Sequence, residues 1–322
     1  MQLMSDVCSK LITLILSFMK QKLNQFSKWA ASLLMIALVI FSSCKKDNTT
    51  QPADTSEVAA TIDASQSDAI AEQQFDDVFN ITMGVQASDA GEEIGLGEGA
   101  DIIYTSTVNP NGTTSPDSSS HCFTVTVVPH IAHVFPKTVT VDFGEGCLGK
   151  DGKLRKGKIV SIFTGPMFIA GSKTSTTFVN YSVDSFAIEG THTVENTSSS
   201  NKQAWEVKVI DGKITNTVSE NWKTWNSVKT HTQIEGNGTP LYARDDVFKI
   251  TGNADGSNSN GNSWTALITE PLIKKFACHW ISQGTVKITR NNNIAVLDYG
   301  DGNCNNKAVI TINGVSHNII LH

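Results

Sequence analysis

The chain has 322 residues, a net charge of −6 at neutral pH, 39% hydrophobic residues and only 17% charged residues. This length is enough for one large domain or two ordinary ones. The low charged fraction, with 24 glycines and many Thr, Ser and Asn residues, is typical of a secreted β protein rather than a cytosolic helical one. The acidic balance supplies no basic surface for nucleic acid, which we exclude as a partner, and no polybasic patch for anionic lipid heads.

The N-terminus contains the three parts of a secretory signal in their usual order. Lysines at positions 20, 22 and 28 precede an apolar run over residues 29–41, and two serines lead to Cys44. The apolar run is shorter than the roughly 20 residues that a bilayer-spanning helix requires. The stretch resembles a lipobox, in which the new N-terminal cysteine receives lipid, although Phe41 stands where leucine is usual.

We therefore predict a signal peptide over residues 1–43 and lipidation of Cys44, which anchors the protein to a membrane. Residues 1–18 are interpreted as an upstream mis-start, because Met19 begins a complete signal. Two alternatives stay open at this point. The leader is cleaved elsewhere, so that Cys44 is an ordinary cysteine, or it is retained as an uncleaved anchor.

One helix is predicted in the mature chain, over residues 67–86. Apolar and small residues at helical spacing form a single stripe that predicts packing against a core, namely Ala71, Phe75, Val78, Thr82 and Val85. Ser65 followed by Asp68 indicates a capping box at the start, and Gly84 stands near the end. The polar residues 44–66 are predicted to form a flexible tether, and residues 87–120 a loop.

From Cys122 onward, apolar and polar residues alternate with the period of a half-buried strand. The predicted strands cover residues 122–128, 138–143, 157–164, 176–189, 203–210, 213–225, 246–251, 263–269, 284–289, 294–299, 307–312 and 316–321. Turn sequences such as Asp151-Gly152, Asp211-Gly212 and Asn313-Gly314 separate them, and short connections favour antiparallel neighbours. We predict an all-β fold, a large antiparallel β-meander over residues 121–322 that forms a barrel, a sandwich or an open curved sheet.

Two segments of this β domain match each other. Residues 141–147 (Val-Asp-Phe-Gly-Glu-Gly-Cys) resemble residues 297–304 (Leu-Asp-Tyr-Gly-Asp-Gly-Asn-Cys), and each follows an earlier cysteine at a similar distance. A hairpin turn midway between the two cysteines of each pair brings them opposite each other. Cleavage of the leader removes Cys8, so four cysteines remain besides the lipidated Cys44. We therefore predict the disulfides Cys122–Cys147 and Cys278–Cys304, formed in an oxidising compartment.

The matching segments also place acidic residues in glycine-rich turns. Asp142 with Glu145, and Asp298 with Asp301, offer the carboxylate oxygens that calcium prefers, and paired carboxylates also serve glycoside hydrolysis. These turns supply fewer acidic positions than a full calcium loop. The favoured interpretation is that the glycines let the chain turn while the acids are solvated. No metal or cofactor is therefore predicted, and calcium at these four residues is the alternative.

Trp222 and Trp225 are the candidate ligand-binding residues. They are an odd number of positions apart, so a regular strand points them to opposite faces and one is expected at the surface. An exposed Trp on a sheet rich in Thr and Asn is suited to stack on a sugar ring, although a core role is commoner for Trp in β proteins. Neither Gly-x-Ser-x-Gly nor His-Glu-x-x-His occurs in the sequence, and no catalytic residue is predicted.

An ordered series of motifs runs from about residue 67 to the C-terminus. It comprises Phe75-Asp76-Asp77-Val78, residues 135–144 with Cys147, Asp151-Gly152-Lys153-Leu154-Arg155, Asp245-Asp246-Val247-Phe248, Pro271-Leu272, Cys278-His279-Trp280-Ile281 and Leu297-Asp298-Tyr299-Gly300. This series resembles a family of uncharacterised lipoproteins from Bacteroidota. The resemblance implies an envelope lipoprotein with a β body, and it brings no known activity, ligand or catalytic residue.

These observations favour a non-enzymatic outer-membrane lipoprotein that acts as a structural or binding component of the cell envelope. Its expected partners are the membrane, through the lipid anchor, and a glycan or another envelope protein. The alternatives are a surface glycan-binding accessory protein and a carboxylate-dependent hydrolase. Lys45-Lys46-Asp47 is a weak version of the acidic run that marks surface export in such bacteria, so the periplasmic and cell-surface faces both stay open.

Overall fold

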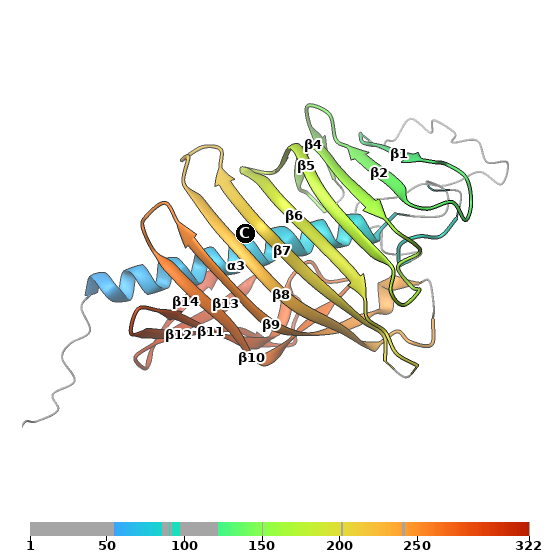
Figure 1. Ribbon diagram of the computed structural model, residues 1–322. Coiled ribbons are helices and arrows are strands. Elements are labelled where there is room, and N and C mark those ends of the chain that lie inside the picture. The colour runs from blue at the N-terminus through green and yellow to red at the C-terminus, as the bar shows by residue number, and fades with distance from the viewer. Residues whose placement is uncertain are drawn as a thin grey trace, which may run out of the picture. The chain divides into compact units, whose positions relative to one another are not determined.

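The computed structural model describes residues 55–85, 90, 92–96, 122–149, 151–200, 202–239 and 242–321. The predicted signal peptide, Cys44, the first part of the predicted tether and most of the predicted loop over residues 87–120 lie outside the described residues. The described residues form a long helix followed by an antiparallel sheet of 14 strands (Figure 1).

The helix, α3, spans Thr55–Met83. The first half of the sheet contains β1 (Thr124–Val128), β2 (Lys137–Asp142), β3 (Cys147–Leu148), β4 (Leu154–Phe163), β5 (Lys173–Val183), β6 (Phe186–Asn196) and β7 (Ala204–Asn216). The second half contains β8 (Trp222–Glu235), β9 (Val247–Asn258), β10 (Ser263–Lys275), β11 (Ile281–Arg290), β12 (Asn293–Asp301), β13 (Lys307–Ile312) and β14 (Val315–Ile320). A short 3-10 helix, η1 (Ala243–Asp245), precedes β9.

The sheet is a meander in which strands pair antiparallel with their neighbours along the chain. The order is β1, β2, β4 and then consecutively to β14, with β3 beside β4. The connections are too short for the crossover that a parallel pair needs, so the predicted antiparallel meander after one helix is confirmed. β1 and β14 stand at opposite ends of the order and the sheet is not closed. The observed form is therefore the open curved sheet, and the barrel and sandwich alternatives are wrong.

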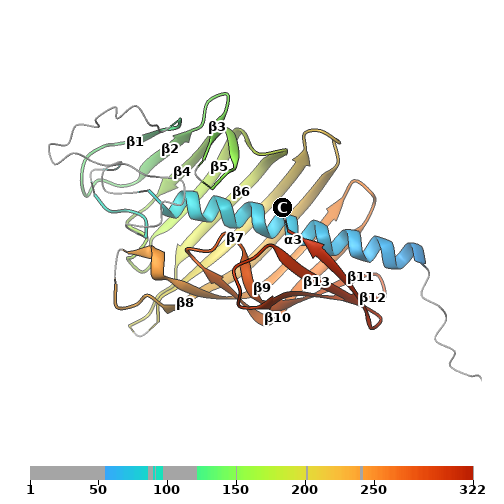
Figure 2. The same ribbon diagram turned by 180° about the vertical axis from the view of Figure 1, so that it is seen from behind.

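The helix lies along the hollow side of the sheet, and the strands bend around it (Figures 1 and 2). It contacts β6 and the strands from β8 to β13. Phe75 stacks on Trp225 with ring centroids 5.6 Å apart, and Phe79 packs edge-on against Phe248 at 6.3 Å. The whole predicted stripe, from Ala71 to Val85, is buried, so the prediction that it faces the core is confirmed.

The start of the helix differs from the prediction. α3 already begins at Thr55, so residues 55–66 are helical and do not belong to a tether. Ser65 is not a cap, because its hydroxyl donates to the carbonyl oxygen of Thr61 at 2.8 Å inside the helix. In the first turns of α3, Glu57 Oε2 accepts a hydrogen bond from Arg290 Nη1 of β11 at 2.5 Å. This tertiary contact stabilises the start of the helix, although the residues there are mostly polar.

Several strand boundaries also differ from the prediction. The predicted strand 176–189 is divided between β5 and β6, with Asp184 at a φ of 51° in the turn, and the predicted strand 213–225 is divided between β7 and β8. Asp211 has the same φ of 51°, yet β7 continues through it, and its register against β8 shifts between Val209 and Gly212. Asp211-Gly212 is therefore a β-bulge, which bends a strand, and the predicted turn there is wrong.

Candidate functional site

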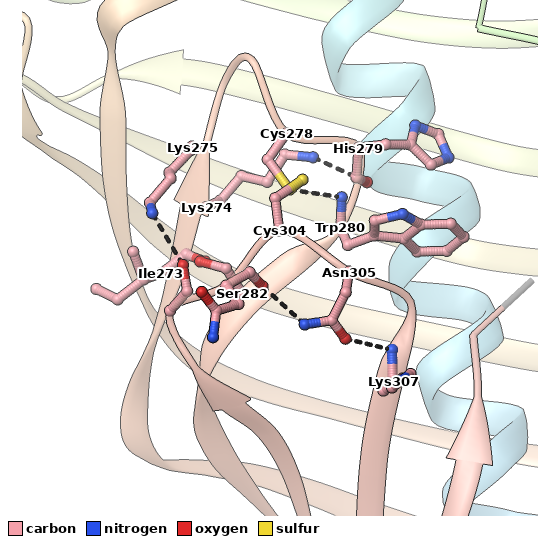
Figure 3. The surroundings of a disulfide bond; sticks show 12 residues. Ile273, Lys274, Lys275, Cys278, His279, Trp280, Ser282, Cys304, Asn305 and Lys307 are labelled. Carbon is pink, nitrogen blue, oxygen red and sulfur yellow. Dashed lines mark hydrogen bonds between the residues drawn. A yellow bond between two sulfur atoms is a disulfide. The ribbon is translucent and has the colours of Figure 1, made fainter.

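Both predicted disulfides are present, and each closes one hairpin. Cys122 bonds to Cys147 across the β1–β2 hairpin, and Cys278 bonds to Cys304 across the β11–β12 hairpin. Figure 3 shows the second bond, beside which Lys274 Nζ donates to the carbonyl oxygen of His279 at 3.2 Å. The predicted pairing is thus confirmed, and the matching segments of the sequence correspond to two stapled hairpins.

The acids of the matching segments shape turns. Asp142 Oδ1 and Asp298 Oδ1 each accept a hydrogen bond from the backbone N–H two residues later, at 2.9 and 2.8 Å. Asp142 also pairs with Lys158 at 2.7 Å, and these hydrogen bonds lower the pKa of its carboxyl group. Asp301 Oδ1 accepts from the Asn303 side chain at 2.8 Å, while Glu145 is exposed. Calcium binding at these turns stays the untested alternative. Within the described ranges, no group of three or more His, Cys, Asp and Glu side chains is placed to hold a metal ion.

The two candidate tryptophans point to opposite faces of β8, as predicted. Trp225 is 1% exposed and donates from Nε1 to Asp68 Oδ1 of α3 at 2.9 Å. Trp222 is 38% exposed on the outer side. The ligand-binding prediction is therefore wrong for Trp225, because the helix covers it, and Trp222 alone of this pair is available to a ligand.

A cluster of buried ion pairs joins α3 to the sheet. Asp77 accepts from Lys153 Nζ at 3.2 Å and from Arg155 Nη2 at 2.7 Å, while Asp76 pairs with Lys274 at 2.6 Å. Burial alone would raise the pKa of Asp77, but Lys153 and Arg155 hold it well below its ordinary value. One turn earlier, Glu72 pairs with Lys229.

This ion-pair cluster gathers the motifs of the sequence resemblance in one place. Asp76 and Asp77 come from the helix motif, Lys153 and Arg155 from the motif after β3, and His279 follows the cysteine that begins the second staple. Each buried charge in the cluster meets an opposite charge, and removing one partner of such a pair is strongly destabilising. The cluster therefore holds the helix in the sheet, and its carboxylates are engaged by the protein itself.

A pocket of about 260 Å³ lies at one end of the central strands β7, β8 and β9. It is formed where β7 begins, β8 ends and β9 is about to begin, together with the turn between β4 and β5. Its lining residues are Leu96, Phe168, Gln203, Trp205, Gln233, Gly236, Asn237, Thr239 and Asp246. The volume is smaller than the roughly 300–1,000 Å³ of pockets for drug-sized ligands, so it suits a ligand smaller than these.

Asp246 is the charged group of this pocket. It is 6% exposed, and its Oδ1 accepts from Gln233 Nε2 at 2.6 Å. Burial, with neighbouring Asp245, raises the pKa of Asp246 to about 7. In the part of the chain that the structure describes, no Lys, Arg or His pairs with it. A perturbed carboxyl group in a concave site is a common mark of function.

The backbone at Gly236 approaches the Asp246 carboxyl group closely. Gly236 has a φ of +87°, a conformation that favours glycine, and a Cβ at this position would overlap Asp246 Oδ1. The wall of the pocket is fixed by Trp205, whose Nε1 donates to the carbonyl oxygen of Met167 at 3.0 Å. Phe168, in contrast, is 42% exposed and open to a ligand.

Sequence reasoning missed this pocket, because its lining comes from five separate segments of the chain. The Asp245-Asp246 pair contributes to the sequence resemblance, but nothing local indicates that one acid is buried and the other is not. The residues Gly236-Asn237-Gly238 indicate a turn, but they carry no sign of a binding site. The need for glycine at position 236 arises from its close approach to Asp246, and this approach is seen only in the tertiary structure.

No protein-family model, curated protein or solved structure matches the chain. The resemblance to Bacteroidota lipoproteins therefore stays a prediction from its motifs. None of the helices in the described ranges has the length and apolar character needed to cross a membrane.

Proposed function

We propose that the protein is an outer-membrane lipoprotein, anchored through lipid on Cys44, that acts as a non-enzymatic binding component of the cell envelope. The ordered signal and lipobox-like stretch support the anchor. The two disulfides support an oxidising compartment outside the cytosol. The observation that carries the binding role is the pocket around Asp246, a buried carboxyl group without a cationic partner among the described residues.

The ligand that best fits this lining is a sugar ring of a glycan. The accessible ring of Phe168 supplies an apolar face on which a pyranose stacks, as in other aromatic recognition sites. Gln203, Gln233, Asn237 and Thr239 supply donors and acceptors for hydroxyl groups. A few convergent polar groups in a partly apolar pocket are what ligand sites share. The glycan proposal thus moves from Trp222 to Phe168 and Asp246.

The binding role is tested with the soluble body, which we define as residues 45–322, without the predicted signal peptide and Cys44. Its thermal midpoint is measured against a panel of polysaccharides, with and without calcium. A ligand at a hundredfold excess over its Kd stabilises the native state by about 2.7 kcal/mol. We expect one glycan to raise the midpoint, and we expect Phe168→Ala to abolish that rise.

Trp222→Ala is the matched control, because it removes an exposed aromatic ring on a different part of the sheet. It is expected to leave the rise intact. A rise lost in Trp222→Ala and kept in Phe168→Ala contradicts the proposed site. A flat response to the whole panel contradicts the glycan ligand and favours a protein partner in the envelope.

The anchor is tested in the full chain with Cys44→Ser. We expect the unchanged protein to fractionate with membranes and to incorporate labelled fatty acid. The Ser variant is expected to lose the label, since the thiol that receives lipid is gone. Label that persists in the Ser variant contradicts lipidation at this residue.

A further inference from the structure

We propose that the Asp246 pocket selects a ligand that carries an ammonium group, and that on a glycan this group is the free amine of an amino sugar. This inference rests on the proposed function, because it names the chemistry of the ligand that the same pocket holds. It adds a specificity that separates aminated sugars from neutral ones of the same shape.

The first support is the contrast between Asp246 and the buried acids of α3. Glu72, Asp76 and Asp77 each pair directly with Lys or Arg. Asp68 accepts hydrogen bonds from two Trp side chains and also has Lys229 nearby. Asp246 is as buried as these acids, yet the charge that acts on it is that of another acid, Asp245. Among the described residues, its only side-chain donor is the neutral amide of Gln233.

The second support is that this carboxyl group lines a cavity, whereas the acids of α3 face protein. A buried carboxylate is stabilised mainly by an opposite charge with hydrogen bonds, so the pocket is electrostatically incomplete without a cation. The pocket also contains aromatic rings, and an ammonium group is attracted to the face of such a ring. An amino sugar brings a ring face for Phe168 and hydroxyl groups for the side-chain amides together with its ammonium group, so it engages more of the lining than a monatomic cation does.

The specificity is tested with two probes that differ only in their amines. The soluble body is titrated at pH 7 with a short chitosan oligomer and with the fully N-acetylated oligomer of the same length. A charge-assisted hydrogen bond is worth about 1.5–3 kcal/mol, so we expect the chitosan oligomer to bind about tenfold to a hundredfold more tightly. Asp246→Asn is expected to remove this preference, since an amide keeps the shape and loses the charge.

Glu270→Gln is the matched control. Glu270 is exposed on β10, and the change removes one acid from the surface without touching the pocket. It is expected to keep the full preference, and a preference that falls equally in both variants shows nonspecific attraction to an acidic protein and overturns the inference. Thermal midpoints verify that the variants are folded, and Phe168→Ala, which keeps Asp246, is expected to weaken binding of the chitosan oligomer.

The outcomes separate this inference from the proposed function. If both oligomers bind equally and Phe168→Ala weakens both, the pocket is a neutral sugar site; the ammonium specificity is overturned and the proposed function stands. If neither binds while another neutral glycan raises the midpoint, the result is the same. If no glycan binds at all, the glycan function and the specificity fall together.

Discussion

Asp246 lies at 6% exposure, and its burial with neighbouring Asp245 raises its pKa from 3.8 to about 7. Between these two values the folded protein holds a proton that the unfolded chain releases. The contribution of this proton to stability is complete below about pH 4 and is lost as the pH rises through 7. The Asp246 carboxyl group therefore makes the fold less stable at high pH, by up to about 1.4 kcal/mol for each pH unit in this window.

The prediction is that Asp246→Asn stabilises the ligand-free protein, and more so at pH 8 than at pH 5. At pH 5 the carboxyl group is already protonated in the folded state and resembles the amide. At pH 8 it is a buried anion without a partner among the described residues. Denaturant unfolding of both proteins at the two pH values measures the difference, and an equal gain at both values contradicts the raised pKa.

Gly236 and Gly238 lie in the same turn but differ in the space around them. A methyl group on Gly236 would overlap the Asp246 carboxylate at a φ of +87°, whereas one on Gly238 meets no heavy atom within 4 Å. We expect Gly236→Ala to lower the free energy of unfolding by about 1–3 kcal/mol and to weaken ligand binding. Gly238→Ala is expected to stay within about 0.5 kcal/mol of the unchanged protein. Equal losses in the two variants contradict the close approach.

The helix α3 is an element that charge, as well as apolar packing, holds in place. Asp77→Ala leaves Lys153 and Arg155 with one less anion between helix and sheet, so we expect a loss of about 3–5 kcal/mol in the free energy of unfolding. Glu195→Ala is the control, because Glu195 pairs with Lys173 at 2.9 Å where both side chains are partly exposed. Such a pair is worth about 0–1 kcal/mol. Urea unfolding of both variants makes the comparison.

The two stapled hairpins make a further prediction at this scale. Their sequence separations are 25 and 26 residues, so the chain-entropy model gives nearly equal stabilisation, about 3 kcal/mol each. We expect the double variants Cys122→Ser/Cys147→Ser and Cys278→Ser/Cys304→Ser to lose similar amounts in denaturant unfolding. A large difference between them shows that one staple acts chiefly through its local contacts.

The helices, strands and disulfides that can be predicted from the sequence are those whose pattern lies in neighbouring residues or in a repeated segment. The stripe through Phe75 and Val78 repeats with the helical period and the cysteine segments match each other, and both predictions are confirmed. The helix start at Thr55 was missed because its polar first turns are held by residues such as Arg290, more than two hundred positions away. Asp211-Gly212 was misjudged because turns and bulges demand the same backbone conformation. The pocket around Asp246 has no local pattern at all.

For the whole molecule, α3 and the sheet form a single folding unit. The helix contacts β6 and the strands from β8 to β13, and its aromatic residues pack against the inner face of the sheet. We expect a body that begins at Ser88, without α3, to lose its cooperative thermal transition and to bind hydrophobic dyes. The body from Lys45 is the control. A cooperative transition in the shortened body contradicts the central position of the helix.

The bond between Glu57 and Arg290 spans 233 residues, and it has a consequence for how the chain is made. Synthesis proceeds from the N-terminus, so the acidic helix emerges long before the lysines and arginines that will neutralise it. Until β11 has been synthesised, the helix cannot pack against the complete sheet, and its charged side chains are expected to stay hydrated. We expect the acids of α3 to keep the newly made segment soluble, and in the folded protein the same acids pair with Arg290, Lys229 and Lys274. Native contacts between residues so far apart in the sequence make folding slow. We therefore expect the last step, in which α3 packs against the C-terminal strands, to limit the folding rate.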